Sequence, residues 1–235
     1  MSELLSDYIK RIPCIKSNIK TFDIVYTYVD HKDRKWYEKL SKYVDYDNIN
    51  LQRYVGYDEI YFSLKTLELF AKKICNKIYI VTDEQKLDET KISNWIKTKI
   101  TYVYHKEIIP KEFLPTFNSI TIESFLYNIP NITNDFLYLN DDVFFGNNVN
   151  SNFFYENGCL NIFLNKIPKI AKITNNKPWL NYYVNVYNLF IKKYNIFPNY
   201  APRHTVHLIN VNNCKLVWSI FNSELKDSIT MFRNN

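Results

Sequence analysis

Residues Phe136–Phe145 read FLYLNDDVFF, an apolar run rich in aromatic residues that three polar residues interrupt. Runs of the same kind occur earlier in the chain. Because these stretches are almost continuously apolar, they are typical of strands that are covered on both faces. We therefore predict four buried strands, the other three being Asp23–Asp30 (DIVYTYVD), Lys77–Asp83 (KIYIVTD) and Ile100–His105 (ITYVYH).

Helical patterns separate these strands. Asp58–Lys72 places its apolar residues on one face at helical spacing. Thr90–Thr98 is a shorter candidate helix, and Asn118–Asn128 starts at the capping residues Asn118 and Ser119. Strands that alternate with helices form βαβ units. The predicted fold class is therefore α/β, with a mostly parallel sheet of the nucleotide-sugar-transferase kind flanked by helices.

The last third of the chain is less regular. Trp179–Tyr194 and Lys215–Phe221 are predicted to be helices of a smaller C-terminal helical lobe. We divide the chain into an N-terminal extension (residues 1–21), an α/β core (22–160) and this lobe (161–235).

Composition excludes several classes of protein. The three glycines, Gly56, Gly146 and Gly158, are far apart. A Rossmann fingerprint or a P-loop needs clustered glycines, so neither is present. The four cysteines form no C-x-x-C pair, which argues against a zinc ribbon and fits a reducing compartment.

The charge and the hydropathy pattern predict a cytoplasmic protein. No apolar run is long enough to span a bilayer, and the first residues lack a signal-peptide core. Thirty basic and 24 acidic residues give a net charge of +6, which is too small to indicate a nucleic-acid partner. This charge is compatible with an anionic substrate and with peripheral contact at the inner membrane face.

Polar side chains are expected at one edge of the sheet. Ligands of open α/β sheets bind beyond the carboxyl ends of the strands. The four predicted strands end at Asp30, Asp83, His105 and the pair Asp141–Asp142. We therefore expect these side chains to gather at one site.

The Asn140-Asp141-Asp142 sequence suggests a metal site. Two adjacent carboxylates in an apolar strand repel each other and are costly to desolvate. Mg²⁺ or Mn²⁺ bound by Asp141 and Asp142 would remove that cost and hold a diphosphate. The alternative is a strand end capped by acidic turn residues.

Other single residues have a functional and a structural interpretation. Glu123 is a candidate site residue or an acidic residue that interacts favourably with a helix N-terminus. For His204 and His207 the functional interpretation is a metal site, and the structural one is a pair of loop histidines. For Arg53 and Arg233 the functional interpretation is binding of a phosphate, and the structural one is an ion pair with a surface carboxylate.

Five blocks taken together resemble the Stealth family of sugar-phosphate transferases. Their order and spacing fit that family, and the last two blocks are long and specific. The blocks are Phe22–Asp33 (FDIVYTYVDHKD), Arg53–Lys65 (RYVGYDEIYFSLK), Lys77–Gln85 (KIYIVTDEQ), Leu114–Glu123 (LPTFNSITIE) and Phe136–Gly146 (FLYLNDDVFFG).

Two later segments resemble the family's third conserved region, and its fourth region is absent from this sequence. The later segments are Pro202–Asn210 (PRHTVHLIN) and Ser228–Arg233 (SITMFR). The resemblance implies that Glu123, Asp142, His204 and Arg233 are active-site groups. The predicted substrate contacts are Asp30, Arg53, Asp83, Asn118, Ser119, Asn140 and His207.

The resemblance implies transfer of a sugar 1-phosphate from a nucleotide sugar, expected to be UDP-linked, to a hydroxyl of a glycan or lipid-linked glycan. UMP would leave, and the product would belong to a capsule or another surface polysaccharide. Two alternatives stay open. One is an ordinary nucleotide-sugar glycosyltransferase that releases UDP. The other is a noncatalytic nucleotide-sugar-binding subunit, which departures from the family pattern such as Tyr28 and Gly56 leave open.

Overall fold

The computed structural model describes residues 21–44, 54–156, 159–166, 181–198 and 200–232. Its residues fall into two compact units. The larger unit runs to Phe153 and resumes at Thr205, and the smaller unit comprises Phe154–His204. The predicted N-terminal extension lies outside the described residues, except for Thr21.

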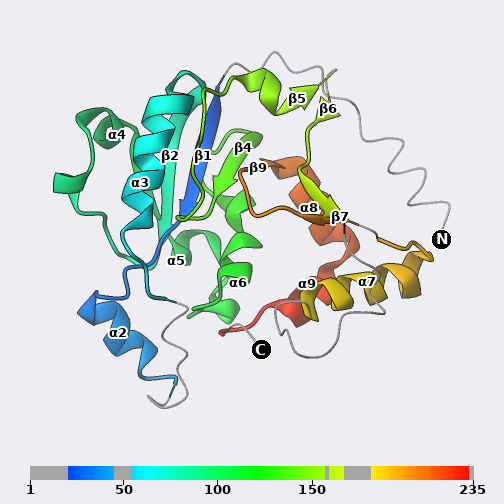
Figure 1. Ribbon diagram of the computed structural model, residues 1–235. Helices are drawn as coiled ribbons and strands as arrows, with labels where there is room; N and C mark the ends of the chain where they lie inside the picture. The colour runs from blue at the N-terminus through cyan, green and yellow to red at the C-terminus, as the bar shows by residue number, and fades with distance from the viewer. Residues whose placement is uncertain (1–20, 45–53, 157–158, 167–180, 199, 233–235) are drawn as a thin grey trace. The chain divides into compact units, whose positions relative to one another are not determined.

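A five-stranded sheet forms the centre of the larger unit, in the order β3-β2-β1-β4-β9 (Figure 1). The first four of these strands are parallel, and β9 is antiparallel to β4. The four predicted strands are therefore confirmed, and the mostly parallel sheet with them. The bounds are β1 Phe22–Thr27, β2 Cys75–Thr82, β3 Ile100–Tyr104, β4 Asp135–Leu139 and β9 His207–Asn210.

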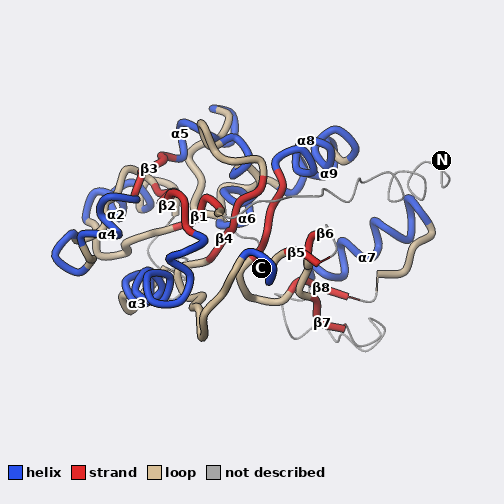
Figure 2. The backbone as a smooth tube through the Cα atoms, turned by 90° about the horizontal axis from the view of Figure 1, so that it is seen from above, coloured by secondary structure: helices blue, strands red, loops and turns tan. Residues whose placement is uncertain are grey.

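Helices cover both faces of this sheet (Figure 2). One face packs against α3, where the Tyr26 and Ser63 hydroxyls lie 3.0 Å apart. The other face, which includes Val25 and Phe136, packs against the segments around α5, α6 and α8. The helices are α2 Arg34–Leu40, α3 Glu59–Thr66, α4 Asn94–Lys99, α5 His105–Ile108, α6 Ser119–Glu123, α8 Val211–Ile220 and α9 Asn222–Ser228.

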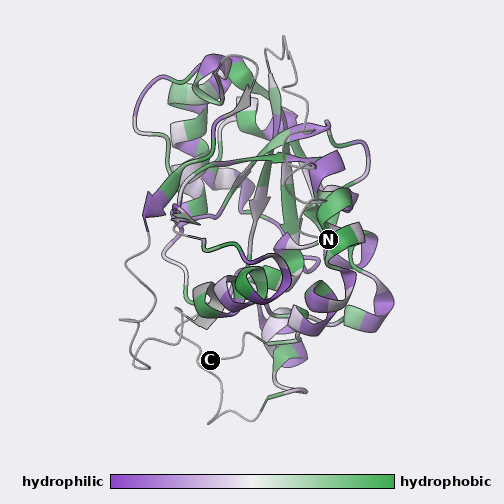
Figure 3. Cartoon of the chain, turned by 90° about the vertical axis from the view of Figure 1, so that its right-hand side faces the viewer, coloured by the Kyte–Doolittle hydropathy of each residue, from purple (hydrophilic) through white to green (hydrophobic). Residues whose placement is uncertain are grey.

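The central strands are buried on both faces, as their continuous apolar pattern predicts. All residues of β4 are buried, and so are the first five of β1. The hydrophobic colour in Figure 3 accordingly runs along the strands of the sheet. Within the described part of the chain, no helix combines the length and the apolar character that crossing a membrane requires.

The described residues of the smaller unit form two short antiparallel strand pairs and one long helix. Its helix, α7 (Asn181–Tyr194), agrees with the prediction of Trp179–Tyr194, whose first two residues lie outside the described ranges. The strand pairs are β5 Tyr155–Glu156 with β6 Cys159–Leu160, and β7 Leu164–Lys166 with β8 Tyr200–Pro202.

The boundaries of the compact units differ from the predicted division at residue 160. The chain returns to the large sheet at β9, so this strand and the two helices after it belong to the larger unit. The predicted helix Lys215–Phe221 falls almost entirely within α8.

Two predicted elements are shorter than the sequence indicated. The predicted strand Phe136–Phe145 ends at Leu139, because the chain then turns and the Val143 amide donates to the Asn140 carbonyl at 3.1 Å. The predicted helix Asn118–Asn128 divides into α6 and a 3₁₀ turn, because the backbone of Phe125 (φ −117°, ψ 5°) leaves the helical region. Glu123 is consequently the last residue of α6, so the interpretation as an N-terminal helix residue is wrong.

A buried polar pair joins β9 to β4. The Asn210 Nδ2 atom donates to the Asp135 Oδ1 atom at 2.6 Å, and both side chains are buried. The Asn210 Oδ1 atom also accepts from the Asn213 amide at 2.9 Å and so caps α8. This one side chain therefore satisfies a buried carboxylate and a helix terminus together.

Replacing Asn210 by alanine should destabilise the protein by about 2–3 kcal/mol, since it removes a helix cap and one hydrogen bond to a buried carboxylate. Urea unfolding followed by circular dichroism measures this change. Asn212→Ala, at an exposed position of the same helix turn, is the matched control and should change stability by less than about 0.5 kcal/mol. Equal stability of the two variants would contradict the role assigned to Asn210.

Candidate active site

A cavity of about 390 Å³ opens at the carboxyl ends of β1, β2 and β4. In the sheet, β2 and β3 lie on one side of β1, and the next strand of the chain, β4, lies on its other side. The cavity lies at this reversal of strand order, where open α/β sheets bind their ligands. Its polar lining residues are Thr27, Tyr28, Glu59, Asp83, Gln85, His105, Thr116, Ser119, Asn140, Asp141 and Asp142.

Four carboxylates line this cavity, and they come from three elements. Asp141 and Asp142 lie in the turn after β4, and Asp83 follows β2. Glu59 is the first residue of α3. Among the residues that the structure describes, the lining of this cavity includes neither lysine nor arginine. Its walls therefore carry an excess of negative charge.

Ionisation of Asp141 is unfavourable in this arrangement of carboxylates. Burial raises the pKa of Asp141 to about 6, and the neighbouring carboxylates of Asp142 and Glu59 act in the same direction. The ionised form is thus disfavoured at this position. A bound cation would reverse that preference.

The predicted metal ligands, Asp141 and Asp142, both line the cavity. Within the described ranges, no group of three or more histidine, cysteine, aspartate or glutamate side chains is arranged to hold a metal ion. Mg²⁺ is often held by only one or two carboxylates together with substrate phosphates and water. The two aspartates fit that kind of shared coordination, and the metal site stays a prediction.

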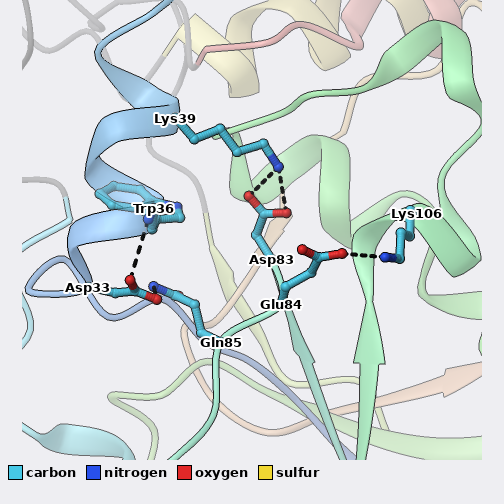
Figure 4. Close-up of polar contacts among 7 residues, drawn as sticks. All are labelled: Asp33, Trp36, Lys39, Asp83, Glu84, Gln85 and Lys106. Atoms are coloured by element: carbon cyan, nitrogen blue, oxygen red, sulfur yellow. Dashed lines mark hydrogen bonds and ion pairs between the residues drawn. The ribbon is translucent and has the colours of Figure 1, made fainter.

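The Asp83 carboxylate forms an ion pair with a lysine. Figure 4 shows Lys39 reaching from α2 to the Asp83 carboxylate, with the Nζ atom 2.8 and 2.7 Å from its two oxygens. His105 is buried beside them. Burial lowers the pKa of His105 to about 4, although the charge of Asp83 acts in the opposite direction. The imidazole is therefore neutral at pH 7.

A hydrogen-bond network connects Glu123 to the cavity. The Tyr138 hydroxyl interacts with the Glu123 carboxylate, donates to the Asn140 Oδ1 atom, and lies 3.2 Å from the Thr27 hydroxyl. Burial raises the pKa of Tyr138, and the negative charge of Glu123 raises it further. Thr27 and Asn140 line the cavity, whereas Glu123 and Tyr138 are not among its lining residues.

Asn118 contacts the C-terminal segment of the chain. Its Oδ1 atom accepts from the Ile120 amide at 3.1 Å, and its Nδ2 atom donates to the Thr230 hydroxyl at 2.9 Å. The Thr121 hydroxyl donates to the Thr230 carbonyl at 2.9 Å. Of the two predicted substrate contacts on α6, Ser119 lines the cavity and Asn118 does not.

The residues after Thr230 reach the aromatic wall of the cavity. The Phe117 amide donates to the Met231 carbonyl at 2.8 Å, and the Phe117 ring stacks on Phe232 at 5.5 Å. Phe117 also packs edge-on against Trp36 at 5.9 Å. Because Trp36, Tyr54 and Phe117 all line the cavity, the C-terminal segment supports this wall.

The remaining predicted residues lie elsewhere. Asp30 is not among the cavity residues, and its Oδ1 atom accepts from the Lys32 amide at 2.9 Å, as a turn former does. His207 lies in β9 opposite Tyr138. His204 is exposed in the bend before β9 and is the last residue of the smaller unit. Arg53 and Arg233 lie outside the described residues.

Several site residues were missed from the sequence. Glu59 stands in the quoted block RYVGYDEIYFSLK, where its acidic character at a helix start was a usable signal. Lys39 and Tyr138 gave no such signal, because their partners Asp83 and Glu123 are distant in the sequence. The aromatic wall was also missed, since aromatic residues are abundant throughout the chain.

Residues 53–163 match the family model described as Stealth protein CR2, conserved region 2. The cavity residues from Tyr54 to Asp142 all fall within this stretch. The matched region therefore supplies all four carboxylates of the cavity.

Curated relatives are named capsular polysaccharide phosphotransferases. LcbA of Neisseria meningitidis is 31% identical over 91% of this chain and 60% of its own length. Cps1A of Actinobacillus pleuropneumoniae is 32% identical over 91% of this chain and 61% of its own length. Fcs1 of Haemophilus influenzae is 32% identical over 88% of this chain and 59% of its own length. This chain thus spans about three fifths of the length of these three relatives.

A solved structure of the galactosyltransferase LgtC, in complex with donor and acceptor sugar analogs, also matches this chain. The TM-score is 0.44 and the sequence identity 12%, over 88% of this chain and 66% of that one.

Asp141→Asn should stabilise the metal-free protein at pH 7.5 by about 1–2 kcal/mol, because it removes a carboxylate that is costly to ionise. The folded wild type holds the Asp141 proton more tightly than the unfolded chain does. Wild-type stability therefore falls as the pH rises from about 4 to about 6, and the advantage of the variant should vanish near pH 4.

Urea unfolding in the presence of EDTA at the two pH values measures this difference. Asp227→Asn, at an exposed position on α9, is the matched control. An Asp141→Asn variant as stable as this control at pH 7.5 would show that the Asp141 carboxylate carries no such cost.

Proposed function

Because this chain is a member of the Stealth family, we propose that it transfers a sugar 1-phosphate from a nucleotide sugar to a hydroxyl of a glycan. One observation carries the proposal: the matched conserved region supplies the four carboxylates of the cavity at the strand reversal. The names of the relatives make a capsular polysaccharide the expected product. The expected donor is UDP-linked, and the acceptor is a glycan or lipid-linked glycan.

The negative lining of the cavity supports a requirement for a divalent cation. A diphosphate would meet Glu59, Asp141 and Asp142 without a lysine or arginine among the described lining residues. Mg²⁺ or Mn²⁺ on Asp141 and Asp142 would neutralise the diphosphate and stabilise the charge that develops during transfer. Arg233 follows Phe232 directly in the sequence, and we assign it the role of a second source of positive charge, since a guanidinium can engage two phosphoryl oxygens.

The reaction exchanges one phosphorus–oxygen bond for another. The acceptor oxygen bonds to the phosphorus next to the donor sugar, the bond from that phosphorus to UMP breaks, and the hydroxyl proton passes to a base. Asp142 lines the cavity and is one candidate base. His204, which the family resemblance makes an active-site group, is the other.

Glu123 is proposed to act through Tyr138. The Tyr138 hydroxyl bridges Glu123 to Asn140, which precedes the two aspartates. Because this hydroxyl carries a single proton, it donates either to the Glu123 carboxylate or to the Asn140 Oδ1 atom, and the shared donor links the two side chains. In this proposal Glu123 positions the start of the aspartate turn. Asn140, Asp83 and Ser119 have direct access to a substrate in the cavity.

Contact with the membrane surface is a further part of the proposal. On α3 and the π-helical turn Leu67–Ala71, Phe62 and Leu69 are each 61% exposed. Lys65 is exposed between them, and Lys72, which is paired with Glu68, is exposed directly after this turn. Apolar and basic side chains on one exposed stripe favour an anionic lipid surface. The cytoplasmic location stays a prediction from the sequence.

The first test resolves the nucleotide that is released. Purified protein is incubated with a panel of UDP-sugars and glycan acceptors, with Mg²⁺ or with EDTA. We expect acceptor-dependent UMP with Mg²⁺ and at least about a hundredfold less product with EDTA or in Asp142→Asn, because positioned charge supplies most of the rate in phosphoryl transfer.

Asp227→Asn, on the exposed face of α9, is the control and should keep wild-type activity. Release of UDP would establish an ordinary glycosyltransferase and overturn the proposal. Donor binding without any product would establish the noncatalytic alternative.

Cosedimentation with vesicles tests the membrane contact. The protein should bind vesicles of phosphatidylglycerol and phosphatidylcholine at low salt, and bind phosphatidylcholine alone at least about fivefold less. Leu69→Asp should abolish binding, whereas Val217→Asp, at an exposed position of α8, should not. Equal binding by these two variants would contradict the assignment.

A further inference from the structure

A second cavity of about 280 Å³ lies next to the first, beyond the ends of β2 and β3. Asp83, His105 and Thr116 line both cavities. The two hollows therefore share a polar wall of three side chains. The other residues that line the second cavity are Lys39, Tyr43, Glu84, Tyr104, Lys106, Leu114 and Pro115.

The second cavity has balanced charges, unlike the first. Lys39 is paired with Asp83, and Lys106 is paired with Glu84. Figure 4 shows both pairs on neighbouring residues after β2. The lining thus contains two amines and two carboxylates. A ligand that carries its own net charge would gain little from such a lining and would compete with the existing pairs.

His105 adds an uncharged group that can both donate and accept a hydrogen bond. Its burial keeps the imidazole neutral at pH 7. The Thr116 hydroxyl is a second uncharged group, which donates to the Thr230 carbonyl at 3.3 Å and accepts from the Asn118 amide at 3.2 Å, and its remaining lone pair can accept one more hydrogen bond. Both lie on the wall that the two cavities share. A ligand in the second cavity therefore meets neutral hydrogen-bonding groups on the side that faces the carboxylates of the first.

Tyrosine rings form another part of the lining. Tyr104 ends β3, and Tyr43 packs against Phe117 with ring centroids 6.3 Å apart. A tyrosine offers an apolar face and a polar hydroxyl in one side chain. The Lys106 Nζ atom lies over the Tyr104 ring, 5.8 Å from its centroid. Aromatic rings beside hydrogen-bonding groups are suited to flat or chair-shaped ligands that carry hydroxyls.

We propose that the second cavity binds an uncharged, hydroxyl-bearing ring of one of the two substrates. Such a ring is either the nucleoside of the donor or a pyranose of the acceptor. The rest of the substrate, which is attached to this ring, would extend past Asp83, His105 and Thr116 into the first cavity, where the phosphates would bind. The inference rests on the proposed function, because it supposes that the first cavity holds the reacting phosphorus.

Binding of two neutral probes tests the inference without any turnover. Uridine and N-acetylglucosamine are titrated separately into the full chain, followed by ligand-observed NMR. We expect one of the two to bind the wild type and to lose at least about tenfold in affinity in Tyr104→Ala. Tyr57→Ala is the matched control, since Tyr57 is 79% exposed and lines neither cavity.

A second variant of the same cavity keeps the inference testable if Tyr104→Ala does not fold. Lys106 is exposed, so Lys106→Ala should fold. It should weaken the same probe at least about threefold, because it removes a hydrogen-bond donor and leaves Glu84 without its partner. Lys97→Ala, at an exposed position on α4, is its control and should bind like the wild type.

The two probes distinguish the two sources of the ring. A loss confined to uridine assigns the cavity to the donor nucleoside, and a loss confined to N-acetylglucosamine assigns it to the acceptor. Unchanged binding of both probes in the Tyr104 and Lys106 variants, or binding of neither probe to the wild type, would overturn the inference. Failure of the proposed function is a separate result, because it would appear as the absence of UMP release by the wild type.

Discussion

Electrostatic repulsion among the carboxylates at one edge of the sheet is the constraint on which the site depends. Parallel strands bring their carboxyl ends together, so side chains that are distant in the sequence meet there. The protein resolves the repulsion differently at each position. Asp83 has Lys39 as its partner, whereas the pKa of Asp141 rises because burial and its neighbours disfavour the charge. In the proposed reaction, a cation that is bound together with the substrate would offset this cost at Asp141.

The sheet and its acidic edge could be predicted because both follow from local patterns. Strands buried on both faces must be continuously apolar, and the residues that end them lie at one edge. Asp30, Asp83, His105, Asp141 and Asp142 were expected there for this reason, and all of them except Asp30 line the first cavity. β9 was not predicted, because a four-residue edge strand has too short a pattern to separate it from the loop around it.

Long-range contacts explain why other parts of the site could not be predicted. Asn118 has the sequence signature of a helix cap, and its Oδ1 atom does cap α6. Its Nδ2 atom holds Thr230, which is 112 residues away in the sequence. Nothing in either segment indicates this partner. The same contact fixes the C-terminal segment beside Phe117, so a residue that was predicted to touch substrate also supports the wall of the cavity.

The Lys39–Asp83 pair divides the two cavities by charge. On one side lie three further carboxylates, and on the other lie a second ion pair and tyrosine rings. A nucleotide sugar and its acceptor have the same division, since the phosphates are charged and the rings on both sides of them are neutral. If Lys39 were absent, Asp83 would add a negative charge to both cavities. The ion pair therefore keeps the second cavity close to neutral and lowers the negative charge of the first.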